Sequence, residues 1–284
     1  ISVTANSLAL CAAASSVTFS KKSITLKSVA VGILEVSDGI MVARGDLGIE
    51  VPYYDVPTIQ KKLIKKANLS CKPVITATQM LLSMTNSERA TRAEISDVAN
   101  AVLDGTDVVM LSEESAIGED PVNVVDTMSN IISRTEDIYN YEKQYKMPYL
   151  DEFDVIQATA TKLADDIGAK GILAVTSSGH SAIKMSRYRP KTKIYAFTHK
   201  KKVLNSLTAV WGVIPVGMIK EAHASMMFNK MLKTLEKSGL LDKKGPYITT
   251  IGYPVGMPGS TNTIKILNEA EIQYYLSLKE KSKK

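Results

Sequence analysis

Short apolar stretches alternate with helix-like stretches from residue 38 to residue 267, and this alternation constrains the fold more than any other feature of the sequence. Strands that alternate with helices form a parallel sheet, either open or closed into a barrel, because a helix carries the chain back to the start of the next strand. The sequence therefore predicts an α/β protein whose ligands gather where the strands end.

The first half of the chain is expected to contain three strands, each followed by a helix. The expected strands are Gly39–Ala43, Pro73–Ala77 and Asp107–Leu111. The expected helices are Pro57–Asn68, with its proline near the start, Thr91–Leu103 and Pro121–Tyr141. The spacing is typical of consecutive units of a parallel sheet or barrel.

The rhythm breaks at residues 143–154, which contain Pro148, and this break predicts a domain boundary. A second α/β unit is expected beyond it. Its expected helices are 155–167, 181–187, 203–210 and 222–238, and its expected strands are 171–175, 193–197, 213–216, 247–251 and 263–267.

The first 34 residues differ from the rest, because no aspartate or glutamate precedes Glu35. Soluble domains average about 25% charged residues and rarely run so far without an acid. We therefore expect residues 1–34 to be a non-matching segment, misread or truncated, residues 35–149 to form the first domain and residues 150–284 the second.

The formal net charge of +6 comes largely from local lysine runs and predicts an ordinary protein surface. No basic stripe alternates with aromatics, so no nucleic-acid partner is expected. No stretch of 18 apolar residues is present, so no membrane span is expected. Cys11 and Cys71 stand alone, which argues against a zinc site or a disulfide framework and favours a reducing, cytoplasmic location.

The most informative segment is Met41–Gly48, in which an apolar strand runs into Arg44, Gly45 and Asp46. Gly45 allows a ligand to approach the backbone, and free N–H groups of a helix starting here would favour an anion. Asp46 is a hard oxygen ligand of the kind that Mg²⁺ prefers. The competing interpretation is a glycine turn with an N-capping aspartate.

Two further polar clusters follow the next two strands. Thr78 offers a hydroxyl to a carboxylate or phosphate, and Ser112, followed by two acids, offers proton relay beside a cation. For each the competing interpretation is helix capping, by Thr78 and by Ser112. A barrel places all such strand ends on one face, so their joint occurrence favours a site.

Four stretches closely resemble the signature motifs of the pyruvate kinase family. They are residues 37–48, 72–80, 91–94 and 96–105. The resemblance runs from about residue 34 to residue 284 and includes residues 186–190 and 210–212. It implies an incomplete (β/α)₈ TIM barrel, of which only the last units are present, followed by the family's C-terminal α/β domain.

The resemblance also implies a chemistry. Pyruvate kinases transfer a phosphoryl group from phosphoenolpyruvate to ADP in glycolysis, with Mg²⁺ and K⁺, usually as tetramers. Asp46 matches the metal-binding aspartate, and Ala43, Arg44 and Gly45 match the backbone around the substrate carboxylate. Thr78 matches the threonine beside the substrate and Ser112 the serine of proton delivery.

A second site is expected after the strand that ends at Val175. Thr176, Ser178 and Ser181 combine hydroxyls with free N–H groups where a helix opens, and the loop resembles the effector-phosphate loop of allosteric pyruvate kinases. Residues 256–262 resemble the loop that closes over a sugar-phosphate effector. The competing interpretation is a capped helix and an ordinary turn.

One family motif is missing. A Lys-x-Glu strand is expected near residues 19–24, where Lys21 and Lys22 stand but no acid follows before Glu35. We therefore expect a fragment without turnover of its own. The alternatives are a module that binds a phosphorylated metabolite and an oligomerisation piece, since Arg92 lies on a helix that resembles the family's subunit contact.

Overall fold

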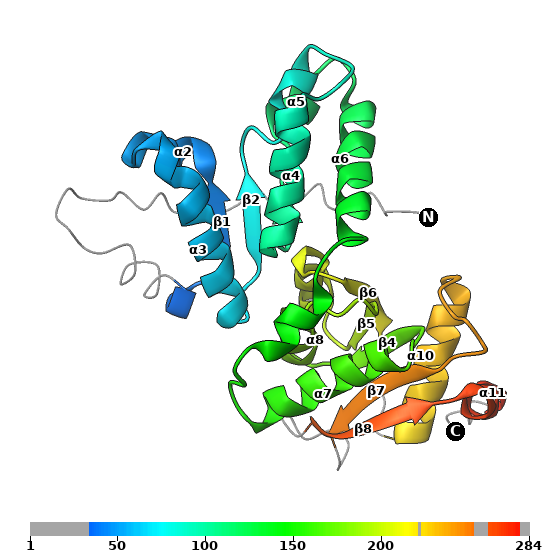
Figure 1. The fold of residues 1–284 in the computed structure, drawn as a ribbon. Coiled ribbons are helices and arrows are strands. Elements are labelled where there is room, and N and C mark those ends of the chain that lie inside the picture. Colours follow the sequence, from blue (N-terminus) through cyan, green and yellow to red (C-terminus); the bar gives the residue numbers. More distant parts are fainter. Residues whose placement is uncertain (1–33, 221–222, 253–260, 279–284) are drawn as a thin grey trace. The chain divides into compact units, whose positions relative to one another are not determined.

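The computed structural model of the chain describes residues 34–220, 223–252 and 261–278 (Figure 1). These residues belong to two compact units, which we call unit 1 (residues 1–140) and unit 2 (residues 141–284). The boundary expected after residue 149 lies close to this division. Within the described residues, no helix combines the length and the apolar character needed to cross a bilayer.

Unit 1 contains a three-stranded parallel sheet in the order β1-β2-β3. Its elements are β1 (Ile40–Ala43), α2 (Arg44–Glu50), η1 (Tyr53–Asp55), α3 (Val56–Leu69), β2 (Val74–Ala77), η2 (Leu82–Thr85), α4 (Arg92–Asp104), β3 (Val108–Val109), α5 (Glu113–Ala116) and α6 (Pro121–Glu136). Neighbouring strands are consecutive in the chain and parallel, as in a (β/α) barrel.

Apolar spacing explains how the helices of unit 1 attach to the sheet. Ile64 and Ala67 of α3 pack with Val42 and Val74 of the strands, and all four are buried. A second cluster joins α4, α6 and the segment after β2. It contains Met80, Leu81, Met84, Val98, Ala101, Val124 and Met128. Thr91 and Glu94 form a capping box that starts α4, so the helix begins where the sequence places it.

Unit 2 contains a five-stranded sheet in the order β6-β5-β4-β7-β8, parallel except for β8. Its elements are η3 (Tyr141–Lys146), α7 (Glu152–Asp166), β4 (Gly171–Val175), α8 (His180–Arg187), β5 (Ile194–Thr198), α9 (Lys201–Ser206), η4 (Leu207–Ala209), β6 (Val213–Met218), α10 (Ala224–Lys237), β7 (Tyr247–Gly252), β8 (Thr261–Leu267) and α11 (Glu269–Ser277).

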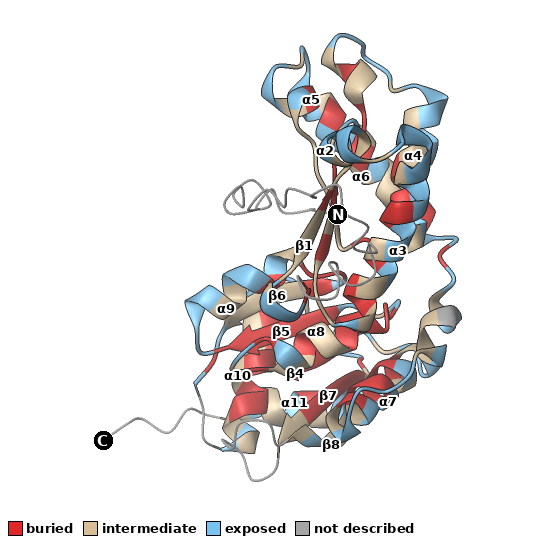
Figure 2. Cartoon of the chain, turned by 90° about the vertical axis from the view of Figure 1, so that its left-hand side faces the viewer, coloured by how far each residue is buried: buried red, intermediate tan, exposed pale blue. Residues whose placement is uncertain are grey.

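Helices cover both faces of the unit 2 sheet, because the strands are apolar on both sides. Ile172 and Ala174 of β4 face a core that includes residues of α7 and α8, whereas Leu173 faces a core that includes residues of α10 and α11. Figure 2 shows β4, β5 and β7 as almost continuously buried. Unit 2 is therefore a three-layer α/β sandwich.

The structure corrects four expected elements. The strand expected to reach Leu111 covers only Val108–Val109, although the Met110 amide still donates to the Thr76 carbonyl. The helix expected to reach Tyr141 ends at Glu136. The helix expected over 203–210 becomes 3-10 after Ser206. Helix α11 was not expected, although Asn268 and Glu271 form a capping box that the sequence displays.

Candidate active site and effector loop

The three polar clusters of unit 1 lie at one edge of its sheet, at the carboxyl ends of β1, β2 and β3. Ala43 pairs with Ala77, so Arg44 and Thr78 leave the sheet side by side. The Gly45 amide donates a 2.9 Å hydrogen bond to Thr78 Oγ1. Thr78 therefore caps α2 from the segment that follows the neighbouring strand. The same hydroxyl is the one that the sequence assigns to substrate contact, so this contact concerns both interpretations of the threonine.

Helix α2 begins directly after β1, with Ala43 at its N-cap and no side-chain cap. Asp46 lies in its first turn, so it is not the N-cap that the competing interpretation required. The Asp46 side chain is exposed and makes no hydrogen bond or ion pair with another described residue. The Asp46 carboxylate is thus open to a ligand at the end of β1, whereas the Gly45 amide of the same helical turn is bound to Thr78.

The Arg44 side chain turns away from that opening and is mostly buried. Its guanidinium donates to the carbonyl oxygens of Ala77, Thr78 and Gln79, and it pairs with Asp97 of α4. The guanidinium of Arg44 is therefore engaged within unit 1, and the predicted role of the Arg44 backbone at a substrate carboxylate stays a prediction.

The residues of the third cluster, Ser112, Glu113 and Glu114, differ in their burial and in their hydrogen bonds. Glu114 is buried, and its carboxylate accepts from the amides of Leu81 and Ser112, at 3.1 and 2.7 Å. It therefore ties the segments after β2 and β3 together and does not face a cation. Ser112 is the N-cap of α5 but its hydroxyl makes no capping hydrogen bond. Of the two acids, only Glu113 is exposed.

The donor set suits a metal only in part. Asp46 supplies one unengaged hard oxygen, which fits Mg²⁺. Across the described ranges, no group of three or more His, Cys, Asp or Glu side chains is placed to hold an ion. Lys21 and Lys22 fall outside the described residues. Among the described residues of this edge, Asp46 is the carboxylate that the sequence motif predicts as a metal ligand.

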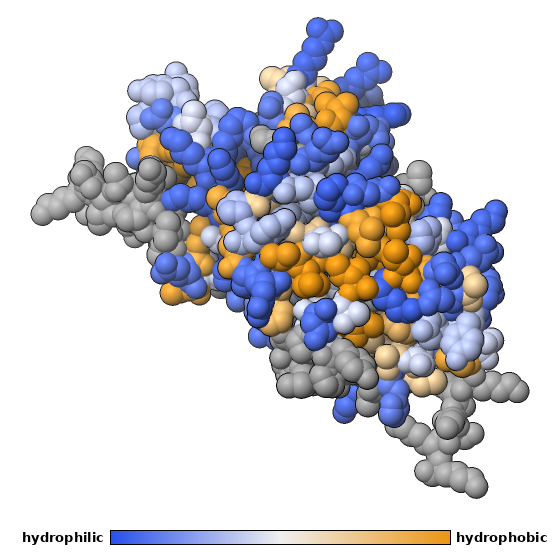
Figure 3. Space-filling model, turned by 60° about the horizontal axis from the view of Figure 1, so that its bottom comes forward, coloured by the Kyte–Doolittle hydropathy of each residue, from blue (hydrophilic) through white to orange (hydrophobic). Residues whose placement is uncertain are grey.

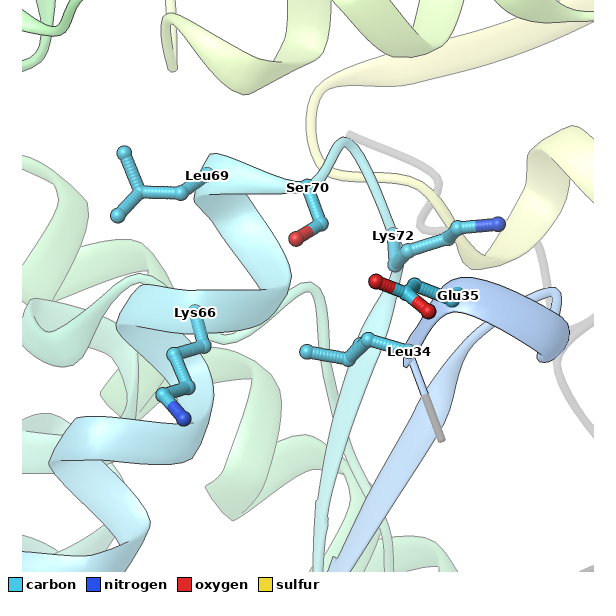
Figure 4. Close-up of a pocket in the computed structure, with 6 residues that line it drawn as sticks. All are labelled: Leu34, Glu35, Lys66, Leu69, Ser70 and Lys72. Atoms are coloured by element: carbon cyan, nitrogen blue, oxygen red, sulfur yellow. The ribbon is translucent and has the colours of Figure 1, made fainter. Parts of the chain in front are cut away.

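A hollow of about 430 Å³ lies at the opposite end of the unit 1 strands, at their amino ends (Figure 4). It is lined by Leu34, Glu35, Lys66, Leu69, Ser70 and Lys72. In Figure 4 the ammonium groups of Lys66 and Lys72 point away from each other, so they do not converge on an anion. Functional sites of barrels lie at the carboxyl ends, so this hollow is not the candidate site.

The loop of unit 2 that the sequence predicts to bind an effector phosphate connects β4 to α8. Thr176 is buried, and its hydroxyl accepts a 2.9 Å hydrogen bond from the Gly179 amide. Gly179 has φ of 94°, a left-handed conformation that glycine adopts without strain. Ser178 Oγ lies 3.2 Å from His180 Nδ1, and both side chains are exposed. The loop is a tight turn that leaves Ser178 accessible.

Two other parts of the effector prediction remain open. Ser181 lies in the first turn of α8, is half-buried, and its hydroxyl makes no hydrogen bond within the described residues. Of the closing stretch 256–262, residues 256–260 lie outside the described residues, and Thr261 and Asn262 begin β8. The structure therefore shows the β4–α8 side of the predicted site alone.

Sequence reasoning missed Asp97 as part of the unit 1 site, and it placed Glu114 beside a cation, whereas Glu114 is buried and accepts two backbone amides. Both contact the segment after β2, directly or through one other residue. Asp97 pairs with the Arg44 side chain, which binds carbonyl groups of that segment, and Glu114 accepts from the Leu81 amide. Nothing in the local sequence of α4 singles out Asp97.

Two family models match the chain. The model described as pyruvate kinase, barrel domain, matches residues 22–125, and that described as pyruvate kinase, alpha/beta domain, matches residues 154–267. The barrel match begins at residue 22, within the segment 1–34 that we expected not to match.

Curated and solved relatives agree with these matches. The chain is 45% identical over 240 residues to a pyruvate kinase of Lactobacillus delbrueckii subsp. bulgaricus, covering 82% of this chain and 41% of that protein. It is 42% identical over 238 residues to a pyruvate kinase of Clostridium acetobutylicum, covering 82% and 50%. The crystal structure of a pyruvate kinase from Cryptosporidium parvum superposes with a TM-score of 0.76 at 37% identity, covering 84% of this chain and 48% of that one.

The chain spans from about 40% to half of the length of the relatives that it matches. Its matched part contains the strand-end motifs of the barrel and most of the α/β unit that follows. On its motifs, its two matched domains and its fold, the chain belongs to the pyruvate kinase family.

Proposed function

We propose that this chain carries the C-terminal part of a pyruvate kinase active site, which transfers a phosphoryl group from phosphoenolpyruvate to ADP. The observation that supports this most is the unengaged Asp46 carboxylate in the first turn of α2, beside the Thr78 hydroxyl on Gly45. Charge neutralisation dominates phosphoryl transfer, so an open anionic metal ligand next to an anion-binding helix N-terminus fits that reaction.

Each residue has a defined role in this proposal. Asp46 would hold Mg²⁺, which neutralises charge on the transferring group when bound, and K⁺ is the second ion that the family implies. The backbone of Ala43, Arg44 and Gly45 would bind the substrate carboxylate, and Thr78 would contact the substrate. Ser112 would deliver the proton to the enolate that forms when the phosphoryl group leaves.

The chain alone is proposed to lack turnover. Its residues 1–34 contain no acid that could act as the second carboxylate, and the loss of one preorganised electrostatic partner costs on the order of 10²–10³ in rate. A lactate dehydrogenase-coupled assay with phosphoenolpyruvate, ADP, Mg²⁺ and K⁺ tests this. Turnover that Asp46→Ala abolishes would overturn the proposal.

The role of Asp46 is tested in a chimaera that completes the barrel with the missing units of a relative. Asp46→Asn keeps the shape of the side chain but removes a charged oxygen ligand, so Mg²⁺-dependent turnover should fall by about 10² or more. Glu50→Gln, an exposed acid at the end of the same helix, is the matched control and should leave turnover unchanged. Equal turnover of Asp46→Asn and the parent at limiting Mg²⁺ would remove Asp46 from the metal site.

A second function, binding of a sugar-phosphate effector, is proposed for unit 2. From residue 167 to residue 235 the sequence contains a single acid, Glu221, against twelve lysines and arginines. The exposed residues after β4, β5 and β6 include His180, His199, Lys200 and Lys220, all at the carboxyl edge of the sheet. This electropositive edge, together with Thr176, Ser178 and Ser181, suits a phosphorylated small molecule.

Calorimetric titration of the whole chain with sugar mono- and bisphosphates tests effector binding. Ser178→Asp places a negative charge in the loop and should weaken binding about tenfold, whereas Ser133→Asp, on an exposed face of α6, should not change it. No binding by any sugar phosphate, or equal binding by Ser178→Asp, would refute the effector site.

Assembly, location and domain limits complete the proposal. We propose a homo-oligomer, tetrameric as in the family, located in the cytoplasm without nucleic-acid or membrane partners. Strand β8 is at the edge of the described unit 2 sheet, and its Ile266 is exposed, so this edge can pair with another chain. Figure 3 shows apolar residues gathered among polar ones on the face that it brings forward. The domains proposed are 35–149 and 150–284, preceded by the segment 1–34. Light scattering after size-exclusion chromatography measures the oligomeric state.

A further inference from the structure

The guanidinium of Arg44 donates hydrogen bonds to three successive carbonyl oxygens at the end of β2 and just after it. Its Nε lies 3.3 Å from the Ala77 oxygen and 3.2 Å from the Thr78 oxygen, and its Nη2 lies 2.6 Å from the Thr78 oxygen and 3.2 Å from the Gln79 oxygen. The other Nη pairs with Asp97. The side chain is only 12% exposed, so these contacts use a largely desolvated cation.

The segment that Arg44 holds is conformationally strained. Thr78 has φ of 71° and Gln79 has φ of 54°. Side chains other than glycine rarely adopt this left-handed region, and a β-branched residue such as threonine is a clear outlier there. Such a conformation persists only where the surroundings impose it.

The strain has a visible result at the candidate site. The left-handed turn aims the Thr78 hydroxyl at the Gly45 amide, 2.9 Å away, at the start of α2. Glu114 holds the far end of the same segment through the Leu81 amide. The segment is thus fixed at both ends, by a cation on its carbonyl groups and by an anion on its amide.

We propose that Arg44 is a positioning residue, whose side chain holds Thr78 and Gln79 in the left-handed conformation and thereby keeps the Thr78 hydroxyl against the N-terminus of α2. Asp97 orients the guanidinium from α4. Arg44 therefore acts on the substrate side through Thr78 and not through its own charge. The catalytic meaning of this contact rests on the proposed function, but the contact itself does not.

Amide hydrogen exchange of Gly45 in the whole chain reports the contact, because this amide donates to Thr78. Arg44→Met should release the turn and speed Gly45 exchange by about tenfold or more. Arg44→Lys should behave nearly as badly, because a single ammonium cannot span three carbonyl groups and a carboxylate. The exposed Arg134→Met, in the last turn of α6, should leave Gly45 exchange unchanged.

A second substitution distinguishes positioning from general loss of stability. Gln79→Gly removes the cost of the left-handed conformation, so Arg44→Met/Gln79→Gly should regain most of the lost Gly45 protection. Gln79→Ala removes the same side chain but keeps that cost, so Arg44→Met/Gln79→Ala should regain none. The Val102 amide of α4, which lies in unit 1 like Gly45, serves as an internal reference for unfolding of that unit.

Two outcomes would overturn the proposal. One is Arg44→Met with Gly45 protected as in the parent. The other is equal protection in the glycine and alanine double variants, which would assign the effect to packing and not to backbone conformation. None of these measurements uses substrate or metal, so they stand apart from the failure or success of the proposed phosphoryl transfer.

Discussion

The sheets of the two units contrast in how far they are covered. In unit 2, β5 is buried at all five positions and β4 at four of five, with helices on both faces. In unit 1, only one of the four residues of β1 is buried and neither residue of β3 is. In unit 2 the helices of the unit cover the apolar strands on both faces, whereas in unit 1 the described residues bury three of the four positions of the central strand β2 and leave β1 and β3 only partly buried.

The difference shows that two units of one family can differ in how well each buries its own sheet, and therefore in stability. Unit 2 contains helices on both faces of its sheet, and residues 154–267 of it match the alpha/beta domain of the family. Unit 1 contains three consecutive strands of a barrel, whose closure would remove the sheet edges. We therefore expect unit 2 to be the more stable unit, and four measurements sharpen or break this comparison.

The largest effect is expected at the buried ion pair of unit 2. Arg187 and Asp154 are both fully buried, 2.8 Å apart, and the same carboxylate accepts from Tyr188 and from the Leu150 amide. Arg187→Met leaves that carboxylate with an uncompensated charge, which should cost unit 2 about 3–5 kcal/mol.

The single tryptophan makes this measurement specific. Trp211 lies in unit 2, buried beneath Arg189, so tryptophan fluorescence during urea unfolding follows unit 2 alone while far-ultraviolet circular dichroism follows both units. The exposed Lys202→Met is the control. An unchanged fluorescence midpoint for Arg187→Met would show that the pair does not stabilise the unit.

A matched pair of cavities compares the two cores directly. Ile194 of β5 and Ile64 of α3 are both fully buried. Truncation to alanine costs 2–5 kcal/mol in general, and more where the surroundings cannot collapse. We expect Ile194→Ala to lower the free energy of unfolding by about 4 kcal/mol. Ile64→Ala should lower it by about 2 kcal/mol, because α3 can move toward its small sheet and reduce the cavity. Urea unfolding by circular dichroism and fluorescence measures both, and the reverse order would break the comparison.

A smaller effect is expected at the capping box of α4 in unit 1. Burial raises the pKa of Glu94, but hydrogen bonds from the Ser83 hydroxyl and amide and from Thr91 outweigh it, so the pKa lies below its ordinary value. The stabilisation is therefore present above the ordinary glutamate pKa and is lost as the pH falls through the lowered one.

Glu94→Ala should cost unit 1 about 1–2 kcal/mol at pH 7 and almost nothing once the carboxylate is protonated. Unfolding of unit 1, followed by circular dichroism from pH 7 to pH 3, should show the parent and variant curves converging in acid. Parallel curves over this range would mean that the charged carboxylate is not what stabilises the cap.

The smallest effect is expected at the exposed ion pair of Lys162 and Asp166 on α7. The hydrogen bond to Asp166 and the negative charge of Asp166 raise the pKa of Lys162. Solvent screens such pairs, so Lys162→Ala should leave the thermal midpoint of unit 2 within experimental error. A clear shift would show that the lysine stem covers Tyr145, whose ring centroid lies 5.9 Å from Nζ.

The sequence alone determined the order of the strands and helices, because apolar period and caps are local. It also placed Arg44, Thr78 and Ser112 at strand ends, since each follows an apolar run directly. It did not determine where β3 and α6 stop, since those limits depend on neighbours that end or begin to pair there.

Tertiary structure alone decided what the site residues do. The sequence assigns only the backbone of Arg44 to the substrate side and gives its side chain no role, yet the guanidinium binds carbonyl groups 33 to 35 residues away and pairs with Asp97. It presents Glu114 as one of two equivalent acids, yet only this one turns inward to accept two amides. A hydrogen bond between distant segments depends on register and packing, which no local pattern encodes, whereas Asp46 makes no such bond within the described residues and its role as a metal ligand stays a prediction from its motif.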